Sequence, residues 1–496
     1  MLRIEDKAPQ TESDVDPISS SGRKQMPVSN AGGTRCFHVF IGLSLLCSGP
    51  GRSVYGQPVS NLTITAASGA RQSLIAMGAT EGVPRNYSSL PLDSRLDMAR
   101  MIWGEDGLGF RVCKLWGDRR WASNGAQMLS SYKRLYDDVN SVQTNMTWMY
   151  GATGHPARDG LEAYAAHHAQ IVADCKAGGL IFQFVGTCNE PNGSNPYLYW
   201  PTNAAALVKD FRTELDKRGL QEVRIISPEC PSVDSTGMGY VQNIKDDPAA
   251  LADLAGFASH SANMCFTPAY YTLCNVPGKE SWQTEGDANG PQGTNDAGLA
   301  ASFAAKACND FNFGCDVWMH FLGYLEYDPG DNATRIMGYD PTTGAHQPFL
   351  VYYYYQQLRR GFQDGCVFRS STSDDTREDR YRTMCFTYGD KPAIVGAAAQ
   401  NVDGSWGLNV VNLTGMPERR PGSGRGSANY QPAATYNITY HVAELADAGT
   451  VRFRLYRSSS TVRDAYQGTV LMRTGDVTFT IAPLELVTLR GRRDPS

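Results

Sequence analysis

Apolar and polar residues follow a regular pattern between Gln72 and about Phe362. Short apolar runs alternate with longer segments in which apolar residues recur at helical spacing, such as 160–179 and 204–220. This order is typical of repeated βα units that build a parallel sheet. The expected strands begin at Ser73, Gly109, Asn145, Leu180, Val223, Leu254, Glu280 and Cys315.

Eight such strands suit an α/β fold of the closed (β/α)₈ type, a TIM barrel over residues 73–362. In that fold the residues at the carboxyl ends of the strands form the active face. A doubly wound open sheet is the alternative, but it would need a glycine-rich first turn. The glycine-rich stretch "GSGRGSA" at Gly422 lies in a late loop and follows no βα unit.

The pattern changes at about Gln363, where helical spacing ends and short β-rich runs such as "WGLNVVNLT" and "VTFTIAP" follow. These runs predict a C-terminal antiparallel β-sandwich side domain over residues 363–496. The segment 57–72 contains "VSNLTITAA" and is expected to add an N-terminal strand to that sandwich.

Residues 1–56 differ from the rest of the chain. A polar stretch leads to Arg35, an apolar run over 36–47 and then small residues, which is the order of a secretory signal peptide. Translation from Met26 or a short anchor would also explain the long polar lead. The run is shorter than the roughly 20 residues of a membrane helix, so we expect no stable membrane span and a secreted, extracellular protein.

Export would make two covalent features expected. One is disulfide bonding among the cysteines from Cys113 to Cys385, although buried free thiols are an open alternative in a chain of this size. The other is a glycoprotein, since Asn-x-Ser/Thr acceptors occur at Asn61, Asn86, Asn145, Asn192, Asn332, Asn412 and Asn437.

Charge and motifs exclude several functions. The formal net charge is -5, so the chain has no basic footprint and nucleic acid is not an expected partner. No HExxH, P-loop or GxSxG pattern is present, and the neighbours His167 and His168 point apart on a helix. We therefore expect no metal and no cofactor, and a monomer.

Two carboxylates stand at the ends of apolar runs. Glu190 lies in the polar cluster that closes "FQFVGTCNEPNG", and Glu285 in the one that closes "ESWQTEGD". Hydrolysis of a glycosidic bond needs two carboxyl groups, one to protonate the leaving oxygen and one to attack or to activate water. Glu280 is a rival for Glu285, but it should lie at the start of its strand. Glu229, at the end of the fifth strand, is the other rival carboxylate.

Other side chains are placed to bind a sugar. Asn189 stands beside Glu190 and can contact the hydroxyl next to the reacting carbon. Aromatic rings offer flat faces to sugars, and four of them fall near predicted strand ends, although core packing is the alternative for each. They are Trp116, Trp148, Trp282 and Trp318.

These segments resemble glycoside hydrolase family 30, within the clan of (β/α)₈ retaining glycosidases. "NEP" at Asn189 and "WQTEG" at Trp282 are similar to the acid/base and nucleophile strands, and "ITAASGARQSLIAMGA" and "FTIAPLELVTLRG" to the entry and last strands. The resemblance covers about residues 58–490. It implies that Glu190 is the general acid/base and Glu285 the nucleophile.

The resemblance also implies further roles. Arg111 and Asp118 match a strand-two Arg and a sugar-binding Asp, and His260 matches a position beside the nucleophile. The aromatic residues that commonly follow that His are replaced by Ser and Ala here. The hydrogen-bond donor to the nucleophile is therefore open, with Tyr270 or Tyr271 as substitutes.

The prediction is a retaining glycosidase that cleaves β-linked polysaccharide or glycoconjugate by double displacement. A non-catalytic carbohydrate-binding protein on the same scaffold, or a retaining glycosidase of another family in the clan, are the alternatives. The two carboxyl groups should lie about 5 to 5.5 Å apart, and the pKa of Glu190 should be raised. The expected substrate-binding residues are Asn189, Arg111, Asp118, Trp148, His260 and Trp318.

Overall fold

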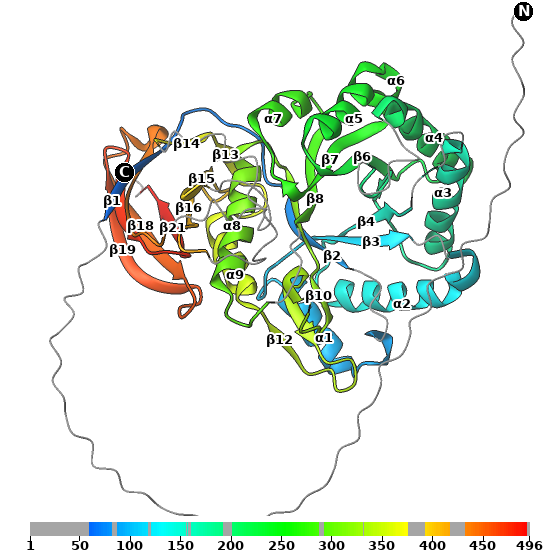
Figure 1. The fold of residues 1–496 in the computed structure, drawn as a ribbon, viewed down its shortest axis with the longest axis horizontal. Coiled ribbons are helices and arrows are strands. Elements are labelled where there is room, and N and C mark those ends of the chain that lie inside the picture. The colour runs from blue at the N-terminus through cyan, green and yellow to red at the C-terminus, as the bar shows by residue number, and fades with distance from the viewer. Residues whose placement is uncertain are drawn as a thin grey trace, which may run out of the picture. The chain divides into compact units, whose positions relative to one another are not determined.

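The computed structural model of the chain (Figure 1) describes most of the residues after Val59. The predicted signal segment 1–56 and Asp118 lie outside the described residues. The described ranges are 59–81, 87–117, 121–154, 156, 160–191, 201–286, 292–330, 332–374, 392–416 and 432–493.

A closed barrel of eight strands forms the larger part of this region, which confirms the predicted TIM barrel. Neighbouring strands are parallel, and β2 pairs with β9 to close the ring. Apolar residues on both faces of each strand make this buried arrangement stable. The strands are β2 (Ala76–Glu81), β3 (Val112–Gly117), β4 (Thr147–Ala152), β5 (Phe184–Gly186), β6 (Arg224–Ser232), β7 (Leu254–Met264), β8 (Glu280–Gly286) and β9 (Val317–Phe321).

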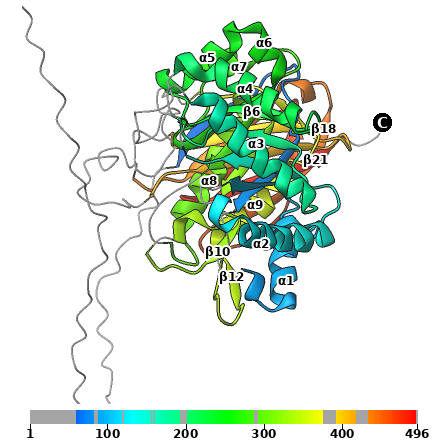
Figure 2. The ribbon, with the colours of Figure 1, turned by 90° about the vertical axis from the view of Figure 1, so that its right-hand side faces the viewer.

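Helices surround the barrel, and Figure 2 shows α3 and α4 on the side that faces away from the β-sandwich. Several begin at a side chain that accepts a backbone N–H of the first turn, as Asp234 does from Gly237 and Asp296 from Leu299. The helices are α1 (Leu92–Trp103), α2 (Trp121–Val142), α3 (Leu161–Ala177), α4 (Ala204–Lys217), α5 (Ser235–Asp246), α6 (Pro248–Asp253), α7 (Pro268–Cys274), α8 (Ala297–Asn312) and α9 (Leu350–Gly361). None of the helices in the described part of the chain has both the length and the apolar composition of a membrane span.

A small sheet interrupts the barrel between β9 and α9. It consists of β10 (Tyr324–Glu326), β11 (Met337–Tyr339) and β12 (His346–Pro348). Tyr324 of this sheet packs against Tyr87 and Trp103, so the insertion is anchored by aromatic contacts to α1 and its preceding turn.

The side domain is the predicted β-sandwich, a sheet of ten strands that packs over its own core. Its strands run antiparallel except that β1 and β17 are parallel. Two parts of the sheet meet closely, because a Cβ on Gly396 of β15 would lie 2.8 Å from Ile64 of β1. The strands are β1 (Ser60–Ala66), β13 (Val367–Arg369), β14 (Ser371–Ser373), β15 (Ile394–Gln400), β16 (Trp406–Asn412), β17 (Tyr436–Val442), β18 (Thr450–Ser458), β19 (Ala465–Arg473), β20 (Asp476–Ile481) and β21 (Leu486–Arg492).

An apolar layer fills the barrel interior toward the amino ends of the strands. Every strand contributes at least one residue. Alternate residues of a strand point to the same face, so these side chains all point inward. We call this group the apolar layer: Ala76, Val112, Met149, Phe184, Ile226, Ala258, Trp282, Val317 and Met319.

The expected disulfides are absent from the described part of the chain, and Cys385 lies outside it. The prediction is corrected in favour of its alternative, because these thiols pack in apolar surroundings between strands and helices. The buried free thiols include Cys113, Cys175, Cys188, Cys230, Cys274, Cys308, Cys315 and Cys366.

Candidate active site

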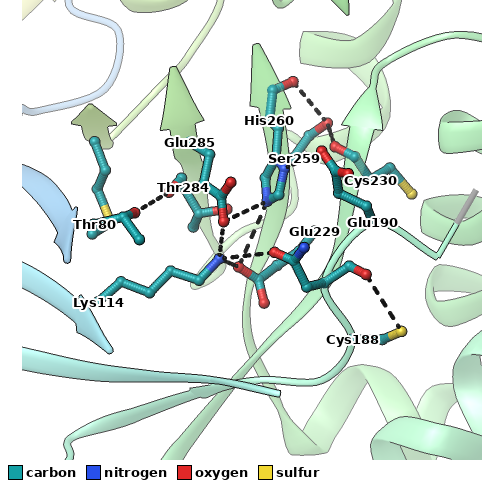
Figure 3. Close-up of polar contacts among 12 residues, drawn as sticks. Thr80, Lys114, Cys188, Glu190, Glu229, Cys230, Ser259, His260, Thr284 and Glu285 are labelled. Atoms are coloured by element: carbon teal, nitrogen blue, oxygen red, sulfur yellow. Dashed lines mark hydrogen bonds and ion pairs between the residues drawn. The ribbon is translucent and has the colours of Figure 1, made fainter. Parts of the chain in front are cut away.

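Five side chains from four strands and the loop after β5 meet at one place in the barrel (Figure 3). We call them the charged cluster. Glu190 follows β5, Lys114 lies in the middle of its strand, and the other three members lie in the carboxyl-terminal halves of theirs. The members are Lys114 of β3, Glu190, Glu229 of β6, His260 of β7 and Glu285 of β8.

His260 lies between the two predicted catalytic carboxylates. Its Nδ1 is 3.2 Å from Oε1 of Glu190, and its Nε2 is 3.7 Å from Oε1 of Glu285. One donor atom from each of the three residues lies within 4.8 Å of the others. The structure therefore brings Glu190 and Glu285 together at one site.

Lys114 contacts the nucleophile candidate directly, a role that sequence reasoning did not assign to it. Its Nζ lies 2.6 Å from Oε1 of Glu229 and 2.8 Å from Oε1 of Glu285. Burial alone would lower the pKa of Lys114, but the charges of the two carboxylates outweigh it and raise the pKa. A buried ammonium ion is thus paired on both sides.

Glu229 and Glu190 adopt an unusual backbone conformation. Their φ angles are 61° and 51°, in the left-handed region that non-glycine residues rarely occupy. The N–H of Glu190 donates to the carbonyl oxygen of Glu229 at 3.1 Å. Gly186 makes room for the Glu229 carboxylate, because a Cβ there would lie 1.8 Å from its Oε2.

Exposure separates the three glutamates. The side chain of Glu190 is 38% exposed and that of Glu285 8%, whereas that of Glu229 is 0% exposed. A substrate in the barrel mouth can reach the first two only. Glu229 is fully buried beneath them. It is therefore not the rival catalytic carboxylate that the sequence allowed.

The positive charges determine how the cluster titrates. Burial would raise the pKa of Glu229, but the Lys114 charge and His260 lower it to about 2. Burial would lower the pKa of His260, but Glu285 and the hydrogen bond to Glu190 raise it to about 10. Lys114 and His260 thus favour the ionised forms of Glu229 and Glu190.

The prediction of a raised pKa for Glu190 is wrong. Burial does favour its protonated form, but the hydrogen bond and charge of His260, together with Lys114, lower the pKa below its ordinary value. Repulsion between the two carboxylates is outweighed by the cations that lie between them.

Asn189 lies in the site, half-buried, with its backbone N–H bonded to the carbonyl of Ala152 at 2.8 Å. Its Oδ1 is 3.5 Å from Nζ of Lys114. Its position beside Glu190 is compatible with contact to a sugar hydroxyl.

Trp148 and Trp318 do not line the site, so their predicted substrate contacts are corrected. Each stands next to a residue of the apolar layer and therefore points outward from the barrel. The indole of Trp148 donates to Asn140 of α2 at 3.2 Å, and that of Trp318 to Asp310 of α8 at 3.1 Å. Both rings are buried between strands and helices.

Arg111 is also corrected, since it lies at the amino end of β3, the opposite end from the cluster. Its guanidinium pairs with Glu105 at 3.0 Å and with Asp364 at 3.2 Å. Glu280 lies at the amino end of β8, where it pairs with Arg224 at 2.8 Å. Lys114, three residues after Arg111, is the strand-two cation that reaches the site.

Neither tyrosine suggested as a donor to Glu285 takes that place. Both belong to α7: Tyr270 packs against Phe266, and Tyr271 stacks under Arg71, with the guanidinium carbon 4.8 Å from its ring centre. Among the described residues, Lys114 donates the hydrogen bond to Glu285 instead.

A pair of aromatic rings stands beside the charged cluster. Trp116 and Phe321 are half-buried with ring centres 5.1 Å apart, and Nζ of Lys114 is 6.0 Å from the centre of the Trp116 ring. Gly151 permits this packing, because a Cβ there would lie 2.8 Å from Cδ1 of Trp116. Trp116 is thus the member of the tryptophan set that faces the site.

The donor atoms of Glu190, His260 and Glu285 lie close enough to hold a divalent cation. The ammonium of Lys114, 2.8 Å from Glu285, opposes a second positive charge at that carboxylate. The charges around these residues therefore favour acid–base chemistry over metal binding.

The sequence and the fold were compared with those of known proteins. No protein-family model and no curated protein matches the sequence. Among solved structures, the catalytic domain of GH30 xylanase C from Talaromyces cellulolyticus superposes with a TM-score of 0.60, at 15% identity, over 86% of this chain and 99% of that chain. This chain has a GH30-like fold.

Two further solved structures are similar to this chain. The GH30 subfamily 8 xylanase Xyn30A from Clostridium acetobutylicum gives a TM-score of 0.60 at 13% identity, covering 87% of this chain and 99% of that chain. The endo-β1,6-glucanase BT3312 gives 0.54 at 14% identity, covering 86% and 94%. At such identities the likeness concerns the fold, so function has to be argued from the site.

Proposed function

We propose that this chain is a retaining glycoside hydrolase that cleaves β-glycosidic bonds of polysaccharide or glycoconjugate. The observation that supports it is the approach of Glu190 and Glu285, with an oxygen of each within 4.8 Å, at the carboxyl ends of barrel strands. Retaining enzymes hold their carboxyl groups about 5 to 5.5 Å apart, whereas inverting enzymes need about 6.5 to 9.5 Å to admit a water molecule.

In the first step, the Glu285 carboxylate attacks the anomeric carbon while the bond to the leaving oxygen breaks. Glu190 donates a proton to that oxygen, and a glycosyl ester forms on Glu285. Although the pKa of Glu190 is lowered, His260 lies 3.2 Å away and can supply the proton along their hydrogen bond. Glu190 then acts as the exposed end of a two-residue proton path.

In the second step, Glu190 accepts a proton from water, whose oxygen attacks the anomeric carbon and releases Glu285 as a carboxylate. Because His260 gave up its proton in the first step, it can take the proton from Glu190 along their hydrogen bond, which restores both groups as the ester is lost.

Substrate contacts follow from the same geometry. Trp116 and Phe321 offer half-buried aromatic faces for a sugar ring, and Asn189 stands beside the acid/base. His260 acts on the two carboxylates rather than on solvent, because it is fully buried. We retain from the sequence the proposals of export, glycosylation and a monomeric state.

A panel of aryl β-glycosides tests this function with wild type, Glu285→Ala and Glu280→Ala. Wild type should hydrolyse at least one member with retention at the anomeric carbon, and Glu285→Ala should lose turnover. Azide should restore activity to Glu285→Ala and give a product of inverted configuration, because the anion replaces the missing nucleophile. Glu280→Ala is the matched control on the same strand.

Two results would count against the proposal. Wild-type protein that binds oligosaccharides but hydrolyses no glycoside would support the carbohydrate-binding alternative. Hydrolysis with inversion would show that water, not Glu285, attacks the sugar.

A further inference from the structure

We propose that Glu229 is a positioning residue that tunes both candidate catalytic carboxylates by holding the ammonium of Lys114 between itself and Glu285. This inference rests on the proposed function for its kinetic consequences, but its structural part is independent of turnover. It assigns a role to the one carboxylate of the charged cluster that substrate does not reach.

The first support is the geometry of a three-member chain. Nζ of Lys114 lies 2.6 Å from Glu229 and 2.8 Å from Glu285, and the side chains of Lys114 and Glu229 are both 0% exposed. Desolvation of an ion costs several kcal/mol, so a buried ammonium ion is stable only with close counter-charges. Without Glu229, Lys114 would bind Glu285 alone and hold it more tightly as an ion pair.

The second support is the fixed position of Glu229. Its backbone is left-handed, its carbonyl oxygen accepts the N–H of Glu190, and its carboxylate occupies the space that Gly186 leaves free. A strained conformation persists only where surrounding contacts hold it in place, and such residues concentrate at functional sites. The backbone contact therefore ties the position of Glu229 to that of Glu190.

The charges that face Glu229 come from every neighbouring strand. Lys114 of β3 and His260 of β7 are the cations, and Glu190 and Glu285 are the other anions. Cys188 and Cys230 lie beside them, with pKa values raised by burial, so both remain neutral thiols. Tyr164, whose pKa is also raised by burial, is the remaining titratable neighbour.

Opposite changes in charge should then move the site in opposite directions. Glu229→Gln removes a negative charge at nearly constant shape, so the pKa values of Glu190 and Glu285 should both fall. Lys114→Met removes the positive charge, so both should rise. Since Glu285 must be ionised and the hydrogen-bonded pair of Glu190 and His260 must hold the proton that is donated, both limbs of the pH profile of kcat/KM should move with these charges.

The experiment compares wild type with Glu229→Gln, Lys114→Met and the double variant. We expect both limbs to move by about one pH unit, downward for Glu229→Gln and upward for Lys114→Met. The double variant removes the pair together and should return both limbs toward wild type, which also provides a folded protein if Lys114→Met alone is unstable. Glu280→Gln, at the other end of the barrel, should leave the limbs in place.

A second readout does not depend on hydrolysis. In protein labelled with ¹³C at the glutamate carboxyl carbons, the Glu190 and Glu285 resonances can be assigned with Glu190→Gln and Glu285→Gln. Their titration midpoints should shift in the same opposite directions as the kinetic limbs. If wild type hydrolyses no glycoside but these midpoints shift as expected, the proposed function fails and the positioning role stands.

Midpoints that do not shift, or that shift the same way in Glu229→Gln and Lys114→Met, would overturn the inference. Glu229 and Lys114 would then be a packing pair only. Loss of activity without a change in the pH profile or in the carboxyl titrations would lead to the same conclusion, because it is what a structural pair predicts.

Discussion

The interior of the barrel has two layers built by the same strands, and they differ in chemistry. Toward the amino ends, the apolar layer is formed by residues such as Val112 and Phe184. Two positions further along β3 and β5, Val112 is followed by Lys114 and Phe184 by Gly186. One step of the strand period therefore separates a packed core from a site of five charges.

The comparison shows how a buried charge is accommodated. The apolar layer is stabilised by removal of hydrocarbon from water. The charged cluster loses the solvation of its ions, and the distances of 2.6 and 2.8 Å around Lys114 show that pairing offsets this loss. Stability and chemistry are thus divided between the two ends of each strand.

The largest expected effect is a loss of activity when a member of the charged cluster is replaced. Glu190→Ala should lower kcat/KM by about 10² to 10⁴ on substrates with poor leaving groups, because general acid catalysis is lost. Activated aryl substrates should lose far less in the first step, since their leaving groups need no proton. Kinetics on matched aryl and alkyl glycosides measure this difference, and equal losses on both would contradict the acid role.

An intermediate effect is expected from the apolar layer. Phe184→Ala removes a ring that packs 4.6 Å from that of Trp282, so the free energy of unfolding should fall by about 3 kcal/mol or more. The pH profile of the remaining folded enzyme should be that of wild type, because no charge changes. Urea unfolding and a pH–rate profile test both statements. A shifted profile would show that the layers are coupled.

The smallest effect concerns a buried carboxyl outside the barrel interior. Glu81 of β2 accepts the N–H of Tyr324 at 3.1 Å, and burial raises its pKa well above 4.5. The folded state then keeps a proton that the unfolded state releases above about pH 4.5, so the free energy of unfolding falls as pH rises toward the folded pKa. The slope reaches about 1.4 kcal/mol per pH unit.

Glu81→Gln cannot titrate and should lack this part of the pH dependence. The difference in unfolding free energy between the variant and wild type should therefore grow in favour of the variant as pH rises above 4.5. Urea unfolding at several pH values measures that difference. A constant difference would mean that Glu81 finds a cation as Glu229 does.

Much of the fold could be predicted because apolar runs of strand length, separated by helical segments, leave few arrangements other than a barrel. That Glu190 and Glu285 come together could be predicted because each lies in a polar cluster that closes such a run. Trp148 and Trp318 were misplaced because nearness to a strand end was used without the strand period. Each is one residue from an inward position, so the period alone could have excluded both.

Other features had no comparable signal. Lys114 lies two residues after Val112, so the strand period places it on the inward face. Lysine is so seldom buried, however, that this residue type argues against that position. The left-handed backbone of Glu190 and Glu229 has no signal in the sequence, since neither is a glycine. The lowered pKa of Glu190 depends on cations from two other strands, a relation that only the closed barrel establishes.

The position of β1 has a consequence for how the protein is made. Asn61 of β1 bonds to Asn437 of β17, 376 residues later in the chain, and the two strands pair along their length. During synthesis, β1 leaves the ribosome long before its partner, so the barrel emerges while its leading strand has an open edge. Such an edge can pair with other chains. The yield of folded protein should therefore depend on how quickly the last hundred or so residues follow.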